Sequence, residues 1–152
     1  SRVSVHTSDG YAAMKSLLPP RQGGQRFNRG LVLVDPPYEA QAAEFDIALK
    51  AMRDVLARWP QGIQMLWYPI KQRRTLTPFV RAATRLQSGG SLLVELLVRA
   101  DDSPLRMNGS GVLILDPPWQ LATALAPALE CLRNAIGHAG SDTRLHWIRE
   151  PA

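Results

Sequence analysis

The chain of 152 residues has the length of one domain, and its hydrophobic share of 45% and charged share of 20% are those of an ordinary globular protein. A net charge of +5 and a pI near 10.0 favour a polyanionic partner. Cys131 is the one cysteine, which excludes an internal disulfide, and the three histidines lack metal-ligand spacing, so we expect no metal. Because the apolar runs are too short to span a bilayer and a lone cysteine suits a reducing compartment, we expect a cytoplasmic protein without a membrane partner.

The first elements predicted along the chain are a strand and a helix. Residues 2–6 alternate polar and apolar side chains, as a short strand does, and the apolar spacing of residues 11–18 predicts a helix. Between them, Ser8 or Asp9 can simply be the N-cap of that helix. At the end of a parallel strand, Asp9 with Gly10 can also hold a nucleoside, because the carboxylate accepts hydrogen bonds and the glycine lets a ring approach. Both interpretations stay open.

The next strand is the one around which the chain is organised. Residues 21–30 form a polar, basic loop that we expect to be a mobile surface connection, away from the catalytic side. The four apolar residues 31–34 then predict a fully buried strand, which ends at Asp35. Open α/β sheets bind ligands at the carboxyl ends of their strands, so this carboxylate is a candidate for chemistry.

Asp35-Pro36-Pro37-Tyr38 fits a planar substrate with an exocyclic amino group. The amine of adenine is a poor nucleophile because its lone pair is conjugated with the ring. The Asp35 carboxylate and the Pro36 carbonyl, by accepting its two hydrogens, would localise that pair. The prolines make the frame stiff, with Pro37 on the substrate side, and the Tyr38 ring can stack on the base. The alternative is a strand-to-helix turn without chemistry.

A strand-helix-strand unit follows the motif. Apolar residues at steps of three and four predict an amphipathic crossover helix over residues 39–59, and residues 63–68 predict the next parallel strand. A second crossover helix is expected over residues 77–86. Three cations lie between that strand and that helix, at the same sheet edge as Asp35, where they can reach a phosphate backbone; a solvated basic loop is the alternative. They are Lys71, Arg73 and Arg74.

Two more strands are predicted over residues 91–100 and 112–115. They are joined without a crossover helix, so they should pair antiparallel. Their connection contains Asn108-Gly109-Ser110-Gly111, on the Asp35 edge of the sheet. Asn108 and Ser110 can shape a base pocket there, and a plain turn is the alternative.

Asp116-Pro117-Pro118-Trp119 repeats the first motif almost unchanged. If the strand before it is antiparallel to its neighbours, Asp116 lies at the opposite rim of the sheet and cannot share a pocket with Asp35. We therefore interpret this copy as a strand-to-helix turn in which Trp119 packs against a helix over residues 121–136. A final short strand is predicted over residues 145–148.

Taken together, these motifs resemble the RlmJ family of bacterial 23S ribosomal RNA adenine-N6 methyltransferases. The matching stretches are Ser8-Asp9-Gly10, Val34-Asp35-Pro36-Pro37-Tyr38-Glu39, Leu66-Trp67-Tyr68-Pro69, and Met107-Asn108-Gly109-Ser110-Gly111 through Asp116-Pro117-Pro118-Trp119. The resemblance implies a Rossmann-like class I α/β fold, with central parallel strands plus an antiparallel pair, that uses S-adenosylmethionine. It also implies that Asp35 and the Pro36 carbonyl bind the target amine beside the cofactor, that Tyr38 stacks on the flipped base, and that Asp9 and Gly10 contact the cofactor's adenosine.

The amino-terminal half of that family has no counterpart in these residues, and the chain opens with Ser1. We therefore expect residues 1–152 to be the C-terminal part of a single methyltransferase domain, a monomer whose partners are the missing amino-terminal part and 23S ribosomal RNA. Alone it should bind the cofactor poorly and be inactive. The alternatives are a DNA adenine-N6 methyltransferase and an RNA-binding module without catalysis.

Overall fold

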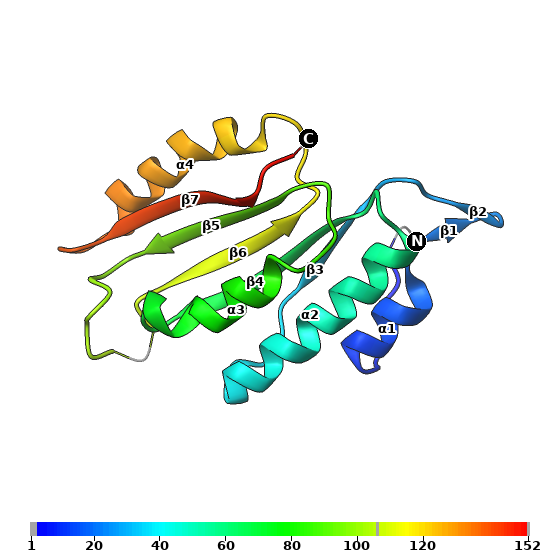
Figure 1. Cartoon of the computed structure of the whole chain (residues 1–152), viewed down its shortest axis with the longest axis horizontal. Coiled ribbons are helices and arrows are strands. Elements are labelled where there is room, and N and C mark those ends of the chain that lie inside the picture. Colours follow the sequence, from blue (N-terminus) through cyan, green and yellow to red (C-terminus); the bar gives the residue numbers. More distant parts are fainter. Residues whose placement is uncertain (1–2, 106, 152) are drawn as a thin grey trace.

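A computed structural model describes residues 3–105 and 107–151, and its centre is a five-stranded mixed sheet (Figure 1). The strand order is β3-β4-β6-β5-β7. The strands are β3 (Leu31–Val34), β4 (Ile63–Ile70), β5 (Ser91–Leu97), β6 (Gly109–Leu115) and β7 (Asp142–Arg149). β3 and β4 are parallel and the other neighbours are antiparallel, so the predicted antiparallel pair of β5 and β6 is confirmed.

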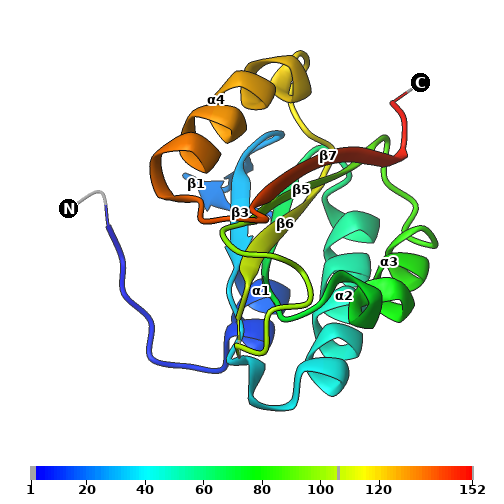
Figure 2. The ribbon, with the colours of Figure 1, turned by 90° about the vertical axis from the view of Figure 1, so that its left-hand side faces the viewer.

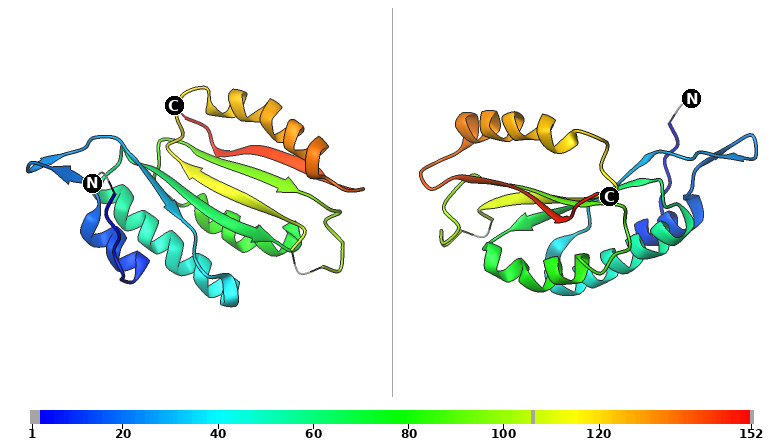
Figure 3. Two further views of the ribbon diagram at one scale, coloured as in Figure 1. Left: turned by 180° about the vertical axis from the view of Figure 1, so that it is seen from behind. Right: turned by 45° about the horizontal axis from the view of Figure 1, so that its top comes forward.

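Helices cover the two faces of the sheet unequally (Figures 2 and 3). One face carries α1 (Gly10–Leu17), α2 (Gln41–Arg58) and α3 (Thr77–Ala83), and the short 3₁₀ turns η1 (Tyr38–Ala40) and η2 (Arg73–Leu76) precede α2 and α3. Of the described helices, α4 (Leu121–Ile136) alone lies on the other face, where it packs on β5 and β7. The apolar residues at steps of three and four in α2 are buried, as their spacing predicts: Phe45, Ala48, Leu49, Met52, Val55 and Leu56.

β3 is the edge strand of the sheet, and the prediction that it is fully buried is wrong. Val34 is buried on the α1 and α2 side, whereas Leu31 and Leu33, on the other side, are 59% and 60% exposed. The reason is the placement of α4, which covers the β5 and β7 end of its face and leaves the β3 end open (Figure 3). A run of apolar residues does not reveal that only one face of a strand is covered.

The glycines of Asn108-Gly109-Ser110-Gly111 lie inside a strand, not in the predicted connection. β6 begins at Gly109, and a Cβ built there would lie 2.1 Å from the Leu96 carbonyl oxygen. A Cβ built on Gly111 would lie 2.5 Å from the hydroxyl oxygen of Tyr68. The glycines therefore allow close packing in a central strand, which is a second use of glycine besides turning the chain.

Asp116 lies at the sheet edge opposite to Asp35, as strand direction predicts. Its Oδ1 accepts a hydrogen bond of 2.5 Å from the Gly89 amide, just before β5 begins. Burial raises the pKa of the Asp116 carboxyl, although hydrogen bonds from the Gly89 and Gly90 amides oppose the shift. The packing expected of Trp119 is wrong, because this side chain is 87% exposed at the start of α4.

The first 30 residues depart from one expectation and add detail to another. The loop over residues 21–30 contains a small hairpin of β1 (Arg21–Gln22) and β2 (Gln25–Arg26), because Gly23 and Gly24 adopt the positive φ angles that a two-residue hairpin turn requires. Residues 3–6 are exposed and belong to neither sheet, and Arg2 lies outside the described residues. An alternating pattern forms a strand only where a neighbouring strand is available to pair with it.

Candidate functional site

A pocket of about 830 Å³ lies at the carboxyl end of β3, between that strand, α1 and α2. This volume is within the usual range of small-molecule sites, roughly 300–1,000 Å³. The lining residues are Asp9, Gly10, Tyr11, Met14, Leu33, Val34, Asp35, Pro36, Pro37, Glu44 and Ile47. The fold thus brings the Asp9-Gly10 pair and the Asp35-Pro36-Pro37 segment, 25 residues apart in sequence, to one cavity.

Asp9 both caps α1 and lines the pocket, so its two interpretations are compatible. Its Oδ1 accepts a hydrogen bond of 2.8 Å from the Ala12 amide, as an N-cap does, and the negative charge is favourable at the amino end of a helix. Gly10 follows it at the pocket wall. Apart from its two chain neighbours and the backbone of α1, no described atom lies within 4 Å of a Cβ built on Gly10, which leaves open space that a planar ring can occupy.

Tyr11 and Glu44 join α1 to α2 at the pocket wall, and sequence reasoning missed both. The Tyr11 hydroxyl donates a hydrogen bond of 2.6 Å to Glu44 Oε1. Burial, followed by the hydrogen bond and the charge of Glu44, raises the pKa of Tyr11, so the phenol stays a donor at neutral pH. Their positions in the sequence could have indicated a role at the pocket. Tyr11 directly follows Asp9-Gly10, and Glu44 lies about one helical turn before Ile47, another lining residue, on α2.

The charged side chains that line the pocket are acidic. Within residues 3–105 and 107–151 they are Asp9, Asp35 and Glu44, and no lysine or arginine of these residues lines it. A cavity of this kind attracts a cation or an amine that donates hydrogen bonds, and it repels phosphate. The remaining wall is largely apolar, which suits a flat ring.

Tyr38 lies beside the pocket and is not one of its lining residues. Its hydroxyl donates to the Trp67 carbonyl, and its half-buried ring lies 5.5 Å from that of Phe45 and 5.9 Å from that of Trp67, between centroids. Gln41 Nε2 likewise donates to the Pro69 carbonyl at 2.9 Å. Beyond the end of β3, these two side chains satisfy carbonyls on the edge of β4. Burial is the main cause that raises the pKa of Tyr38.

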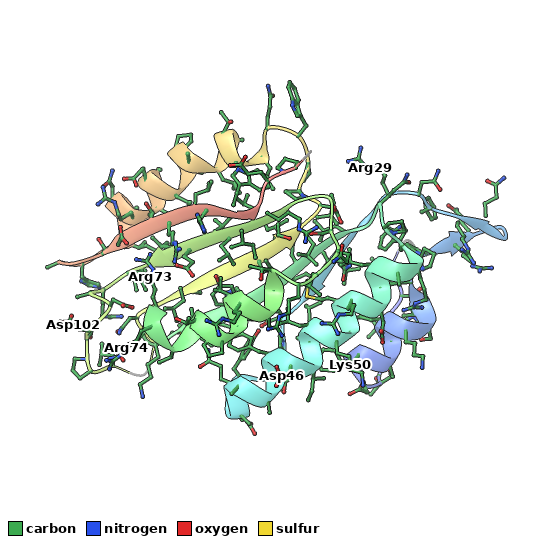
Figure 4. All side chains as sticks on the ribbon, in the orientation of Figure 1. Arg29, Asp46, Lys50, Arg73, Arg74 and Asp102 are labelled. Atoms are coloured by element: carbon green, nitrogen blue, oxygen red, sulfur yellow. The ribbon has the colours of Figure 1, made fainter. Side chains whose placement is uncertain are left out.

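The three predicted cations follow β4, and two of them, Arg73 and Arg74, lie far from the hairpin end of the molecule in Figure 4. β4 extends to Ile70, four residues beyond Leu66, which is the last residue paired with β3. Lys71, Arg73 and Arg74 therefore lie farther along the same edge than Asp35, and none of them lines the pocket. Lys71 and Arg74 are exposed, as expected for contacts with a phosphate backbone.

Arg73 is not the free cation that the sequence prediction assumes. Its Nε donates to Glu95 Oε2 at 2.8 Å, its NH1 to Asp142, and its backbone amide to Asp101 at 2.7 Å. Tyr68 completes the network by donating to Glu95 Oε1 at 3.0 Å. Glu95 is buried, so it needs these donors, and Arg73 holds the loop after β4 to β5 and β7.

Asn108 and Ser110 do not form the expected pocket wall. The Asn108 side chain is fully buried, and its Nδ2 donates to the carbonyls of Lys71 at 2.8 Å and Ser103 at 3.0 Å. Ser110 lies within β6, paired with Pro69 and Leu96. Asn108 therefore fixes the loops after β4 and β5, which are the loops that present Lys71 and Arg74.

Residues 3–105 and 107–151 contain no group of three or more His, Cys, Asp or Glu side chains suited to a metal ion and no helix long and apolar enough to cross a membrane. The mixed α/β sheet, with an acidic ligand pocket at the carboxyl end of a strand, is consistent with a methyltransferase-like fold.

Comparison with known proteins identifies the family within that class. The chain belongs to the family described as "Ribosomal RNA large subunit methyltransferase D, RlmJ", whose model matches residues 1–149. The predicted family resemblance is thereby confirmed.

Two relatives are named "Ribosomal RNA large subunit methyltransferase J". The protein of Haemophilus influenzae is 31% identical over 147 residues, which are 96% of this chain and 50% of that protein. The protein of Escherichia coli K12 is 30% identical over 149 residues, 97% of this chain and 51% of that protein. A crystal structure of a Legionella pneumophila protein superposes with a TM-score of 0.76 at 25% identity, covering 91% of this chain and 49% of the other. The chain thus spans about half the length of the relatives it matches.

Proposed function

We propose that this chain carries the amine-binding part of a site that transfers a methyl group from S-adenosylmethionine to adenine N6 in 23S ribosomal RNA. The observation that carries the proposal is the meeting of Asp35 and Pro36 with Asp9 and Gly10 in one acidic pocket. The names of the relatives supply the class of substrate, ribosomal RNA, and the class of reaction, methyl transfer. The amine and the methyl donor are argued from the residues.

Asp35 and Pro36 are proposed to act on the amino group. Pro36 has no amide hydrogen, so this segment offers the amine a carboxylate and a carbonyl as acceptors. When both N–H groups donate to these acceptors, the nitrogen lone pair is less available to the ring and more available to an electrophilic methyl group. Asp35 is exposed and Pro36 buried, so the carboxylate can meet a base while the proline holds its position. After transfer, the amine nitrogen carries an extra proton, which Asp35 or solvent accepts.

The charge and the volume of the pocket support S-adenosylmethionine as the proposed methyl donor. S-adenosylmethionine supplies an electrophilic methyl group on a sulfonium cation, and the three lining carboxylates favour a cation. Asp9 and Gly10 are the residues proposed to contact its adenosine: the carboxylate accepts hydrogen bonds, and the open space at Gly10 admits a ring. Glu44, held by Tyr11, adds negative charge to the same wall.

The substrate side of the site is proposed to lie between the pocket and the loop after β4. Tyr38 would stack on the flipped base, next to Pro37. Lys71 and Arg74 would contact phosphates, and Arg73 and Asn108 would hold their loop in place. Ser110 lies within β6, where it pairs with Pro69 and Leu96 in the sheet. We propose that it supports this surface from a distance and does not contact RNA itself.

We further propose that these residues are the C-terminal part of one class I methyltransferase domain and that the preceding part of a longer protein completes the site. In support, β3 is an edge strand, and Leu31 and Leu33 leave an apolar surface at that edge. The proposed assembly is a cytoplasmic monomer whose partner is 23S ribosomal RNA. These 152 residues alone should then bind S-adenosylmethionine weakly, and calorimetry showing tight binding to them would contradict this part of the proposal.

The test is a methylation assay with a full-length protein that includes these residues. Deproteinised 23S ribosomal RNA and DNA compete for labelled methyl groups, and the products are digested to nucleosides. The proposal predicts N6-methyladenosine from the RNA. Label in DNA would favour a DNA adenine methyltransferase, and RNA binding without any transfer would favour a module without catalysis.

A further inference from the structure

The β1–β2 hairpin and its flanks form a basic arm at the end of the molecule away from Arg73 and Arg74. We call residues 19–29 the arginine arm; it projects beyond the sheet and helices (Figures 1 and 3). Arg21 and Arg26 lie directly opposite each other in the hairpin, closed by two glycines with φ angles of +58° and +85°. Like charges opposite each other in a two-stranded ribbon repel, and an anion bound between the two arginines would relieve this repulsion.

A second pocket, of about 600 Å³, lies between the arm and the carboxyl end of α1. Of the residues that the structure describes, four cations line it, Lys15, Arg21, Arg26 and Arg58, and no aspartate or glutamate does. Within residues 3–105 and 107–151, the ion pairs of the structure are those of Arg73 and Arg133, so none neutralises this cluster. The charge of this pocket is opposite to that of the Asp35 pocket, and it suits phosphate.

The arm also presents an aromatic ring beside its cations. Phe27 is 46% exposed, next to Arg26 in the sequence, and Arg29 projects from the base of the arm (Figure 4). An exposed aromatic ring among arginines is typical of surfaces that bind single-stranded nucleic acid, where phosphates meet the cations and a base stacks on the ring.

The base of the arm is firmly held. Trp59 is buried, and its Nε1 donates to the Asn28 carbonyl at 3.0 Å. Its ring packs closely on Gly30 and Gly62: a Cβ built on these glycines would lie 2.8 Å and 2.3 Å from the nearest ring atom of Trp59. Arg58 NH1 donates to the Lys15 carbonyl at 2.6 Å, which ties α2 to the end of α1. A surface held in this way loses little conformational entropy when it binds a ligand.

We propose that the arginine arm is a second contact for ribosomal RNA, separate from the methyl-transfer site: Arg21 and Arg26 bind phosphates, and Phe27 stacks on an unpaired base. The proposal rests on the proposed function in taking ribosomal RNA as the substrate. The two pockets touch opposite ends of α1, whose eight residues span roughly 12 Å, so one RNA can reach both.

The test measures the RNA affinity of a full-length protein that includes these residues, as a function of salt. Fluorescence anisotropy with single-stranded fragments of 23S ribosomal RNA gives the slope of log K against log salt concentration. For Arg21→Gln/Arg26→Gln, the slope should fall by about 1.4, or roughly 0.7 for each lost phosphate contact. The matched control is Arg81→Gln/Arg85→Gln, which removes the same charge from exposed positions on α3 and in the turn after it, and should change the slope less.

Phe27→Leu provides a second measurement, because leucine keeps an apolar side chain but cannot stack. Affinity should fall by about fivefold or more while the salt slope stays unchanged. Equal slopes for the hairpin pair and the Arg81/Arg85 control pair, together with unchanged affinity of Phe27→Leu, would overturn the proposal.

These measurements need no methyl donor, so they separate the arm from the chemistry. Suppose the salt slope of RNA affinity is reduced in Arg21→Gln/Arg26→Gln, and the unsubstituted full-length protein transfers no methyl group. The proposed function would then be rejected, and the arm would remain an RNA contact. Normal methyl transfer alongside an unchanged slope would reject the arm alone.

Discussion

Replacing Asn108 by alanine tests whether this residue holds the loops at the substrate edge of the sheet. The fully buried amide donates to the Lys71 carbonyl at 2.8 Å and to the Ser103 carbonyl at 3.0 Å. Asn108→Ala removes both donors and leaves two acceptors in a confined place. Each unsatisfied buried group costs about 1–3 kcal/mol, and since Lys71 is exposed and Ser103 half-buried, we expect the low end, about 2–3 kcal/mol in total.

Urea unfolding followed by circular dichroism measures this loss as a change in the free energy of unfolding. Asn28→Ala is the matched control, because the Asn28 side chain is exposed and its backbone carbonyl, the acceptor for Trp59, remains. The control should change stability by no more than about 0.5 kcal/mol. If Asn108→Ala costs no more than Asn28→Ala, the amide does not anchor these loops and the reasoning fails.

Two further predictions concern hydrogen bonds between side chains. Tyr11→Phe removes the hydrogen bond to Glu44 but keeps the charge of Glu44, whereas Glu44→Gln keeps an acceptor for the tyrosine but removes the charge. If negative charge attracts the methyl donor, calorimetry on the full-length protein should find weaker donor binding for Glu44→Gln than for Tyr11→Phe. The reverse order would exclude an electrostatic role. The hydrogen bond from Arg73 lowers the pKa of Asp142, so this pair stabilises the fold above the ordinary carboxyl pKa and is lost as the pH falls through the lowered value. Asp142→Asn should therefore flatten the fall in stability between about pH 5 and pH 2, by less than about 1 kcal/mol because Asp142 is largely exposed; acid curves that coincide would contradict the pairing.

Strand direction was the part of the fold that the sequence predicted best. A short connection between two apolar runs indicated an antiparallel pair, and this placed Asp116 at the rim opposite to Asp35, as the structure has it. The long amphipathic pattern of α2 was equally informative. Both patterns depend on local spacing, which the sequence states directly.

Burial and the use of glycine were harder to predict, because both depend on which elements become neighbours. Leu31 and Leu33 read as core residues, yet no helix covers their face of the edge strand. Gly109 and Gly111 read as a turn, yet they make room for a neighbouring strand and for Tyr68. The Trp119 prediction failed because it also depended on which elements become neighbours: the side chain is exposed and does not pack against α4.

The sequence indicated which chain segments form the candidate site but not which side chains contact one another there. Asp9 and Asp35 were expected at strand ends, and the structure brings them to one pocket. Glu44 lies on a helix whose pattern indicates only which face is buried, and its bond to Tyr11 depends on how α1 packs against α2. The buried Glu95 was unforeseen, because its partner Arg73 had been interpreted as a surface cation.

The central claim is that Asp35, and not its near copy Asp116, binds the target amine. The direct test measures transfer of labelled methyl groups to deproteinised 23S ribosomal RNA by full-length proteins carrying Asp35→Ala or Asp116→Ala, with folding checked by thermal unfolding. We predict that Asp35→Ala abolishes transfer while the protein remains folded, and that Asp116→Ala retains it. Transfer by folded Asp35→Ala at an unchanged rate would contradict the account.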